Sequence, residues 1–477
     1  MAPLLANRTL YASAIALAAA IAVAAVSAPT TEVAATITID PAMEFQTMRG
    51  WEATIDLPED ENRALLLKAR ETILDKAVDE VGVNRVRLEV RSGAEGSIGA
   101  WTRYAAGEIG YKEWRPLRYA TTNDDDDPHH INWAGFDFSE LDRMIEEQVE
   151  PMRRRLAARG EKLIVNLCYV AFTKQIGRGG AYIHDDPDEY AEFVLATYLH
   201  VKEKYGFQPD SWEVILEPDL SPEWTPLVVG RSIAAAAKRL EENGVTPHFV
   251  APSVTDTGNA ARYIDGIARV DGAMEHVAEF SYHRYRRASA ANVAAIAERG
   301  AKFGKPTAML ELWFGRATPK VLFEDLIVGK AAAFQGRTLY GLFDVRDDGD
   351  AAPTVTPRKD IAQNRQVFRH VRLNAMRIGA SSPASSVRPV AFRNPDGGLV
   401  VAVLTNAPAH LTVRGMTPGP YEVSYRADGR SHVEAEPLIV TENGAGEARI
   451  PAPGIITIAA IADSPETNQS ERNESQP

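Results

Sequence analysis

From residue 50 to about residue 345, segments with the pattern of a buried strand alternate with segments that have the period of an amphipathic helix. This alternation limits the possible folds more than any other feature, because it predicts parallel strands joined by helices. The strand-like segments number about eight and lie at 50–55, 84–90, 162–170, 211–218, 248–254, 276–285, 306–314 and 338–345. The helical segments lie at about 138–160, 186–206, 226–243, 258–270, 289–304 and 318–335.

Eight strand–helix units over residues 36–380 match an α/β fold of the (β/α)₈ TIM-barrel type with some insertions. An open, doubly wound sheet is the alternative for this pattern. Such a sheet usually has a glycine-rich phosphate loop after its first strand, and no such loop follows residues 50–55. The barrel is therefore the predicted fold.

The pattern changes from about residue 384, where the helical period disappears. Short strand-like runs follow one another, separated by turn sequences such as NPDGG and NGAG. This predicts a small, C-terminal antiparallel β-sandwich domain over residues 381–463. The strand-like run at 36–40 is a candidate to join this sandwich.

Both ends of the chain have distinctive compositions. Residues 1–35 contain one arginine, a long uncharged alanine-rich run and small residues at the end, which is typical of a secretory signal peptide. The alternative is a retained membrane anchor, since the apolar run is long enough to span a bilayer. Cleavage predicts a secreted or periplasmic protein with no stable membrane insertion, and the polar residues 464–477 predict a disordered tail.

The charge and the cysteine content limit the classes of partner. The formal net charge of −13 argues against nucleic acid, whose binders carry clustered basic residues, and leaves neutral polymers such as glycans open. Cys168 is the only cysteine, so the chain forms no internal disulfide. A secreted chain without disulfides fits an exported enzyme with a large core.

Two glutamates lie at the ends of predicted strands, where barrel enzymes place their active-site residues. Glu217 ends the fourth strand segment, SWEVILEP, and Glu311 lies near the end of the seventh, PTAMLELW. Either could be an ordinary surface charge. As a pair they provide what glycoside hydrolysis needs, namely one acid that protonates the leaving oxygen and one carboxylate that attacks the anomeric carbon.

With this pair in place, the chain resembles the clan A glycoside hydrolases, and most of all family 30 and its relatives. In that clan the acid/base glutamate ends strand four and the nucleophile ends strand seven, which are the places of Glu217 and Glu311. Family 30 also has a β-sandwich made from the C-terminal segment and an N-terminal strand. The resemblance implies a retaining hydrolase that cleaves β-glycosidic bonds of an oligosaccharide, polysaccharide or glycoconjugate, with no cofactor and no metal.

Seven further residues are candidates for contacting the substrate. The resemblance implies that Arg87, on strand two, contacts the nucleophile and that an aromatic residue or histidine on strand six lies beside it. The alternatives are a surface salt bridge for Arg87 and ordinary packed polar residues on strand six. Aromatic residues at strand ends are candidate platforms for sugar rings, and GWEATID is similar to the start of family 30 barrels, with Glu52 where a small residue is usual. The candidates are Trp51, Glu52, Arg87, Tyr169, His283, Tyr285 and Trp313.

The chain departs from the clan at Leu216, because the clan usually has asparagine immediately before the acid/base glutamate. That asparagine commonly binds the hydroxyl next to the reacting carbon. A non-catalytic glycan-binding barrel is therefore a second hypothesis. A hydrolase of another clan A family, acting on uronic-acid or xylose units, is a third. The long segment 92–135 is predicted to cover the cleft and to shape its specificity.

Overall fold

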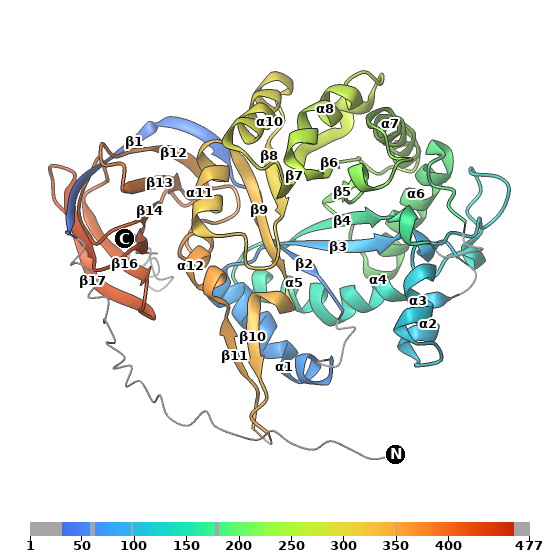
Figure 1. The fold of residues 1–477 in the computed structure, drawn as a ribbon, viewed down its shortest axis with the longest axis horizontal. Coiled ribbons are helices and arrows are strands. Elements are labelled where there is room, and N and C mark those ends of the chain that lie inside the picture. Colours follow the sequence, from blue (N-terminus) through green and yellow to red (C-terminus); the bar gives the residue numbers. More distant parts are fainter. Residues whose placement is uncertain (1–30, 58–62, 97–98, 177–180, 350, 462–477) are drawn as a thin grey trace, which may run out of the picture. The chain divides into compact units, whose positions relative to one another are not determined.

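The computed structural model describes residues 31–57, 63–96, 99–176, 181–349 and 351–461. Most of the predicted signal peptide and the whole predicted tail lie outside the described residues. The described residues form a parallel barrel and a C-terminal sheet domain (Figure 1). No helix in these ranges is long and apolar enough to cross a membrane.

Eight parallel strands close into the barrel, each hydrogen-bonded to the next, so the predicted fold class is confirmed. In chain order they are β2 Gly50–Ile55, β3 Arg85–Arg91, β4 Ile164–Val170, β5 Ser211–Glu213, β6 Phe249–Asp256, β7 Val277–Arg286, β8 Thr307–Glu311 and β9 Ala331–Thr338.

Helices connect consecutive strands of the barrel, and one more, α12, follows the last barrel strand and leads to the C-terminal sheet. They are α1 Arg63–Asp75, α4 Ser139–Met144, α5 Glu150–Ala157, α6 Pro187–Tyr205, α7 Pro226–Glu242, α8 Thr257–Ile267, α9 Ala273–His276, α10 Ala290–Phe303, α11 Pro319–Ile327 and α12 Lys359–Phe368. Two short helices, α2 Ala100–Ala105 and α3 Tyr111–Leu117, form an insertion after β3. The ends of α6 show why the sequence is helical there: Asp186 caps the first turn, and Gly206 ends the helix with a left-handed φ of 70°.

The eighth strand is not where the sequence predicted it. We expected a helix at 318–335 and a strand at 338–345, but α11 ends at Ile327 and β9 occupies Ala331–Thr338. The run AAAFQG has high helix propensity, yet it pairs with β8 and β2 and is buried. The predicted strand is instead a short turn followed by β10 Phe343–Arg346, which pairs with β11 Thr354–Pro357 outside the barrel.

The C-terminal domain is one nine-stranded sheet whose apolar residues form a second core, separate from that of the barrel. Its strands are β1 Val33–Thr47, β12 Met376–Ser381, β13 Val387–Arg393, β14 Leu399–Thr405, β15 Ala409–Arg414, β16 Gly419–Ala427, β17 His432–Val440, β18 Ala445–Ile450 and β19 Gly454–Ala460. The N-terminal strand β1 lies between β12 and β15, antiparallel to the first and parallel to the second. After the barrel, this domain begins with β12 at Met376, before the expected boundary at residue 381. The sequence did not predict this strand, because MRIGAS is a short run with few apolar residues.

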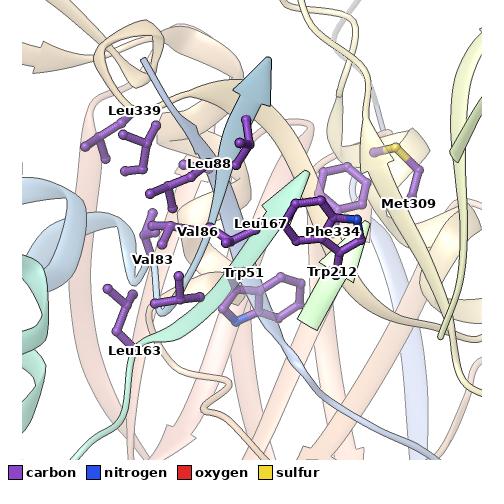
Figure 2. Packing of buried hydrophobic residues seen from close by; sticks show 14 of the residues in the cluster. Trp51, Val83, Val86, Leu88, Leu163, Leu167, Trp212, Met309, Phe334 and Leu339 are labelled. Atoms are coloured by element: carbon purple, nitrogen blue, oxygen red, sulfur yellow. The ribbon is translucent and has the colours of Figure 1, made fainter. Parts of the chain in front are cut away.

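The alternation of side chains along the strands separates an apolar layer from a charged one. On β3, Val86 and Leu88 face away from the barrel axis and pack in the layer between strands and helices (Figure 2). Arg85 and Arg87 face the interior, and both are buried. Burying an apolar side chain of this size contributes about 1.5–3 kcal/mol, so the outer layer stabilises a barrel whose interior is ionic.

One buried carboxyl lies outside the barrel interior, in the middle of α6. Glu192 is fully buried, and neither of its oxygens has a hydrogen-bond partner among the described residues. Burial, together with the nearby carboxylates of Asp124, Glu95 and Glu189, raises the pKa of Glu192 to about 8. Glu192 is therefore neutral in the folded protein at pH 7 and ionised in the unfolded chain.

We expect Glu192→Gln to stabilise the protein at alkaline pH. Because the folded pKa of Glu192 lies above the ordinary value of 4.5, the folded state holds a proton that the unfolded chain releases, and stability falls between about pH 4.5 and about pH 8. Glutamine does not titrate, so the Tm of the wild type should fall relative to that of the variant across this range. Thermal unfolding of both proteins at several pH values measures the difference, and parallel Tm curves would contradict the assignment.

Candidate active site

Glu217 is positioned by an irregular segment and not by a regular strand. β5 ends at Glu213, and the backbone then hydrogen-bonds to both neighbouring strands: the Leu216 N–H donates to Tyr169 O at 2.9 Å and the Glu217 N–H to Ser253 O at 3.0 Å. Glu217 has a left-handed φ of 52°, a conformation that costs a non-glycine residue about 1–2 kcal/mol. Such strain is concentrated at functional sites.

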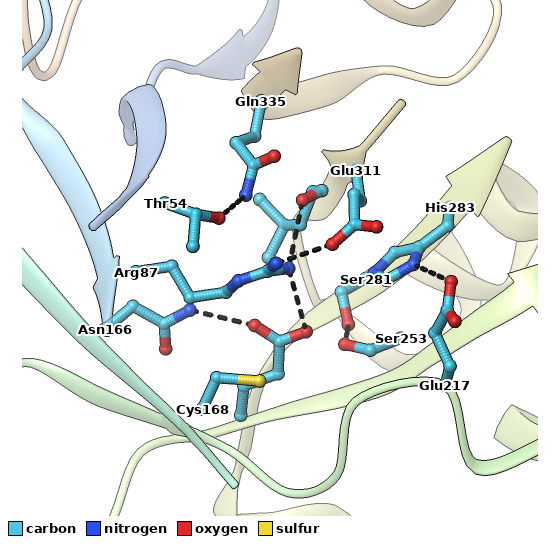
Figure 3. A network of polar contacts seen from close by, with 12 residues as sticks. Thr54, Arg87, Asn166, Cys168, Glu217, Ser253, Ser281, His283, Glu311 and Gln335 are labelled. Atoms are coloured by element: carbon cyan, nitrogen blue, oxygen red, sulfur yellow. Dashed lines mark hydrogen bonds and ion pairs between the residues drawn. The ribbon is translucent and has the colours of Figure 1, made fainter. Parts of the chain in front are cut away.

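Glu311, the last residue of β8, accepts hydrogen bonds on both oxygens. Arg87 Nη2 donates to Oε2 at 2.5 Å, and the Tyr285 hydroxyl donates to Oε1 at 2.8 Å (Figure 3 shows the Arg87 contact). Arg87 comes from β3 and Tyr285 from β7, so two other strands of the barrel fix the direction of this carboxylate.

Glu217 has a different partner. His283 Nδ1 lies 3.0 Å from Glu217 Oε1, and the imidazole is fully buried (Figure 3). Burial acts to raise the pKa of Glu217, but the hydrogen bond and charge of His283 outweigh it and the pKa is lowered. Burial acts to lower the pKa of His283, but the charges of Glu311 and Glu217 and the hydrogen bond to Glu217 raise it above 6.5.

The two glutamates meet at the centre of the barrel mouth. One side-chain oxygen of each, together with a ring nitrogen of His283, lie within 4.8 Å of one another. Carboxyl groups about 5–5.5 Å apart are typical of retaining glycosidases, whereas inverting enzymes have about 6.5–9.5 Å. Two carboxylates and an imidazole are also metal-ligand types, and these three are the residues that could hold an ion here. The absence of a metal stays a prediction.

Arg87 joins the pair to a third carboxylate. Its Nη1 lies 4.0 Å from Glu213 Oε1, and the guanidinium is fully buried. Burial acts to lower the pKa of Arg87, but the charges of Glu311 and Glu213 raise it well above the ordinary value. Arg87 is therefore a permanent cation between Glu311 and Glu213.

Glu52 lies one layer below the site and not in it. Arg85 Nε donates to Glu52 Oε2 at 2.6 Å, and Arg85 Nη2 lies 2.8 Å from Glu279 Oε1. The register of β2 with β3 pairs Glu52 with Arg85, and Thr54 with Arg87 nearer the mouth. The predicted substrate contact of Glu52 is therefore wrong, because its ion pair closes the lower barrel.

Two predicted aromatic platforms are also wrong. Trp51 is 1% exposed, stacks on Phe368 of α12 with ring centroids 4.4 Å apart, and donates its indole N–H to Val371 O. Tyr169 is fully buried, with its hydroxyl 2.7 Å from His184 Nδ1. Both residues alternate with interior positions of their strands, so their rings point toward the helices.

Trp313 lies at the mouth. Its ring is partly exposed, its Nε1 donates to Gln335 Oε1 at 2.8 Å, and its backbone N–H lies 3.2 Å from the Tyr285 hydroxyl. Gln335 also donates to Thr54 Oγ1 at 2.7 Å (Figure 3). Sequence reasoning missed Gln335 because its segment has the composition of a helix, although a lone glutamine inside a buried alanine run was a signal for it.

Leu216, the departure from the clan pattern, is buried. It packs with Tyr119, Cys168 and Val170, and Phe172 lies against the same cluster. The wall next to Glu217 on the side of β4 is therefore apolar.

Comparison with known proteins identifies a family and several solved structures to which this chain is similar. Residues 374–458 match the glycosyl hydrolase family 30 beta sandwich domain. The resemblance to family 30 that the sequence predicted is thereby confirmed for the C-terminal domain. No curated protein matches the chain.

Solved structures match over both domains. A family 30 endoxylanase from Clostridium papyrosolvens C71 is 16% identical, with 90% of this chain and 100% of that chain covered and a TM-score of 0.63. The catalytic domain of a family 30 xylanase C from Talaromyces cellulolyticus is 14% identical, with the same coverage and a TM-score of 0.64. The endo-β1,6-glucanase BT3312 is 15% identical, with 90% and 95% covered and a TM-score of 0.58. At these identities the likeness shows a common fold.

We expect His283 to titrate above its ordinary pKa of 6.5 and the Glu217→Gln substitution to lower that pKa. The substitution removes a charge and a hydrogen bond that raise it, while burial continues to lower it. Titration of the imidazole resonances by NMR measures both values, with the nine other histidines as internal controls. A His283 resonance that titrates below 6.5 in the wild type would disprove the charged pair.

Proposed function

We propose that this chain is a retaining glycoside hydrolase that cleaves β-glycosidic bonds, with Glu311 as nucleophile and Glu217 as acid/base. The observation that carries the proposal is that one side-chain oxygen of Glu217 and one of Glu311 lie within 4.8 Å of each other at the mouth of a TIM barrel. The likeness to family 30 structures supports it. The signal-like composition of residues 1–35 supports secretion.

Glu311 has the surroundings of a nucleophile. Arg87 and Tyr285 donate to its two oxygens and orient it for attack on the anomeric carbon. When Glu311 forms the glycosyl ester it loses its negative charge. Arg87 still has Glu213 at 4.0 Å as a counter-charge, so the covalent intermediate does not leave a buried cation uncompensated.

Glu217 and His283 share the proton that the leaving group needs. Because the pKa of Glu217 is lowered and that of His283 is raised, the two titrate as a coupled pair that holds one proton across the Nδ1···Oε1 contact. In the first step Glu217 passes this proton to the leaving oxygen. In the second step Glu217 accepts a proton from the water that hydrolyses the ester.

The substrate class is a β-linked polysaccharide or its oligomers. The similar structures include two xylanases and an endo-β1,6-glucanase, so xylose and glucose polymers are the first substrates to test. A hydrolase of another clan A family acting on uronic-acid or xylose units remains the alternative. One observation favours a competing function, a barrel that binds glycans without cutting them. Leu216, in apolar surroundings, precedes Glu217, so no amide side chain is present there to hold a sugar hydroxyl.

A screen with aryl β-glycosides and polysaccharides tests the function. We expect Glu311→Gln to reduce kcat by at least about 10⁴-fold, since the nucleophile is lost. Glu217→Gln should reduce kcat/KM about 10²–10⁴-fold on substrates with poor leaving groups. The loss should be much smaller with 2,4-dinitrophenyl glycosides, whose leaving group needs no proton. Proton NMR of the first product should show the β-anomer.

Tyr340→Phe is a suitable control, because its buried hydroxyl has no hydrogen-bond partner within the described ranges. A first product with the α-configuration would rule out retention. Glycan binding without hydrolysis, unchanged by Glu311→Gln, would favour the binding protein.

A further inference from the structure

Asp219 lies two residues after the proposed acid/base, in the short turn η6 Pro218–Leu220. Its side chain is half-buried, and both of its carboxylate oxygens accept hydrogen bonds. Oδ1 accepts from the Thr255 backbone N–H at 2.9 Å, and Oδ2 accepts from the Asp256 backbone N–H at 3.1 Å. Asn259 Nδ2 also donates to Oδ2, at 3.0 Å. Because three protein donors surround this carboxylate, Asp219 is suited to hold other groups in place and not to protonate a substrate.

The partners of Asp219 belong to the neighbouring strand and helix. Thr255 and Asp256 are the last two residues of β6, and Asn259 lies in the first turn of α8. Asp219 therefore connects the chain that follows β5 to the end of β6. Hydrogen bonds from backbone N–H groups to a carboxylate are charge-assisted and are about twice as strong as those between neutral groups. Asp219 thus attaches the turn to β6 more firmly than a neutral side chain would.

The conformation of Glu217 requires such an attachment. Glu217 has a left-handed φ of 52°, and Ser253, whose carbonyl oxygen accepts the Glu217 N–H at 3.0 Å, has a φ of 51°. Left-handed conformations are unfavourable for residues other than glycine and persist only where the surrounding contacts fix them. Pro218 has no N–H and adds no backbone hydrogen bond. The next attachment of this segment to β6 is the carboxylate of Asp219.

The junction of β6 and α8 also holds His283, the partner of Glu217. The buried hydroxyl of Thr257 donates to the His283 backbone carbonyl at 2.8 Å. Two residues earlier on β7, the Ser281 hydroxyl is hydrogen-bonded to that of Ser253 (Figure 3). The contact of 3.0 Å between Glu217 Oε1 and His283 Nδ1 therefore depends on two segments that are both held against this junction.

Arg287 fixes the surroundings of Asp219 from a third segment. It directly follows β7, its Nη2 donates to Asn259 Oδ1 at 2.8 Å, and its Nε donates to Asp256 Oδ2 at 2.8 Å. Because Asn259 and Asp256 both donate to Asp219, these contacts form a closed ring of four residues. A residue that positions a catalytic group needs a side chain whose own direction is fixed in this way.

We propose that Asp219 is a positioning residue for the acid/base, which holds the Glu217 segment against the end of β6 so that the Glu217 carboxyl stays beside His283. This role rests on the proposed function and adds to it a residue outside the two glutamates and their direct partners. It accounts for the fixed place of Glu217 at the barrel mouth, although an irregular segment and not a strand carries it.

Kinetics with two kinds of leaving group test this role. We expect Asp219→Ala to lower kcat/KM about 10²-fold on phenyl β-xyloside and phenyl β-glucoside, because a displacement of the acid by about 1 Å costs that much. With the 2,4-dinitrophenyl glycosides of the same sugars, whose leaving group needs no proton, kcat/KM should fall less than about threefold. Asp219→Asn keeps one acceptor oxygen and should lose less than Asp219→Ala on the phenyl glycosides. Equal losses on both leaving groups would show a merely structural role and overturn the inference.

Asp210→Ala is the matched control. Asp210 directly precedes β5, at the end of the strand away from the mouth, and its carboxylate also accepts from a backbone N–H, that of Val165 at 2.9 Å. This variant should leave the ratio of kcat/KM between the two leaving groups unchanged. A ratio that changes as much in Asp210→Ala as in Asp219→Ala would contradict a specific role for Asp219.

Amide hydrogen exchange measured by mass spectrometry separates this role from the proposed function. In Asp219→Ala we expect peptides that cover residues 214–221 to exchange faster than in the wild type, because their attachment to β6 is lost. Asp210→Ala should leave these peptides unchanged. This result would support the attachment of the Glu217 segment by Asp219 even if no glycoside is hydrolysed. Unchanged exchange in Asp219→Ala would overturn the inference even if the protein is an active hydrolase.

Discussion

The rest of the site depends on the buried ion pairs that the guanidinium of Arg87 makes with its neighbouring carboxylates. The guanidinium lies between Glu311 on strand seven and Glu213 on strand four, and none of the three is more than 5% exposed. A buried cation is stable only when opposite charges and hydrogen bonds surround it. Glu311 and Glu213, together with Glu89 at 3.5 Å, supply these charges to Arg87, and in return Arg87 fixes the direction of Glu311 at the end of β8. The Arg85 layer beneath obeys the same rule with Glu52 and Glu279.

Charged residues on the strands were predictable from sequence in a way that aromatic residues were not. A charged side chain in a buried strand is stable where other charges can pair with it, and alternation put Glu311 on a shared face near the strand end, while the resemblance to family 30 was needed to place Arg87 and His283. Aromatic rings suit both faces. Trp51 and Tyr169 lie on the expected strands but alternate with Glu52 and Cys168, so they pack under the helices. Glu52 shows the limit of this reasoning. Alternation predicts that its side chain faces the barrel interior, but it does not predict how far below the mouth of the barrel the side chain lies.

Features that depend on distant segments escaped prediction. β9 has the composition of a helix and is a strand because β8 and β2 offer their open edges to it. The left-handed conformation of Glu217 is held by hydrogen bonds that the backbone N–H groups of Leu216 and Glu217 donate to the carbonyl oxygens of Tyr169 and Ser253. Neither a helical propensity nor a strand period contains this information. The C-terminal sheet was easier, because each of its strands from β13 onward pairs with one nearby in sequence or carries a clear alternation of its own.

The two glutamates have opposite partners, and this asymmetry supports the roles proposed for Glu311 and Glu217. Glu311 is held by a cation that cannot lose its proton and by a phenol, whereas Glu217 is held by an imidazole that can exchange one. A group that must stay a carboxylate through attack needs the first environment. A group that must give and then take a proton needs the second, because an imidazole can itself release and take up a proton at each step.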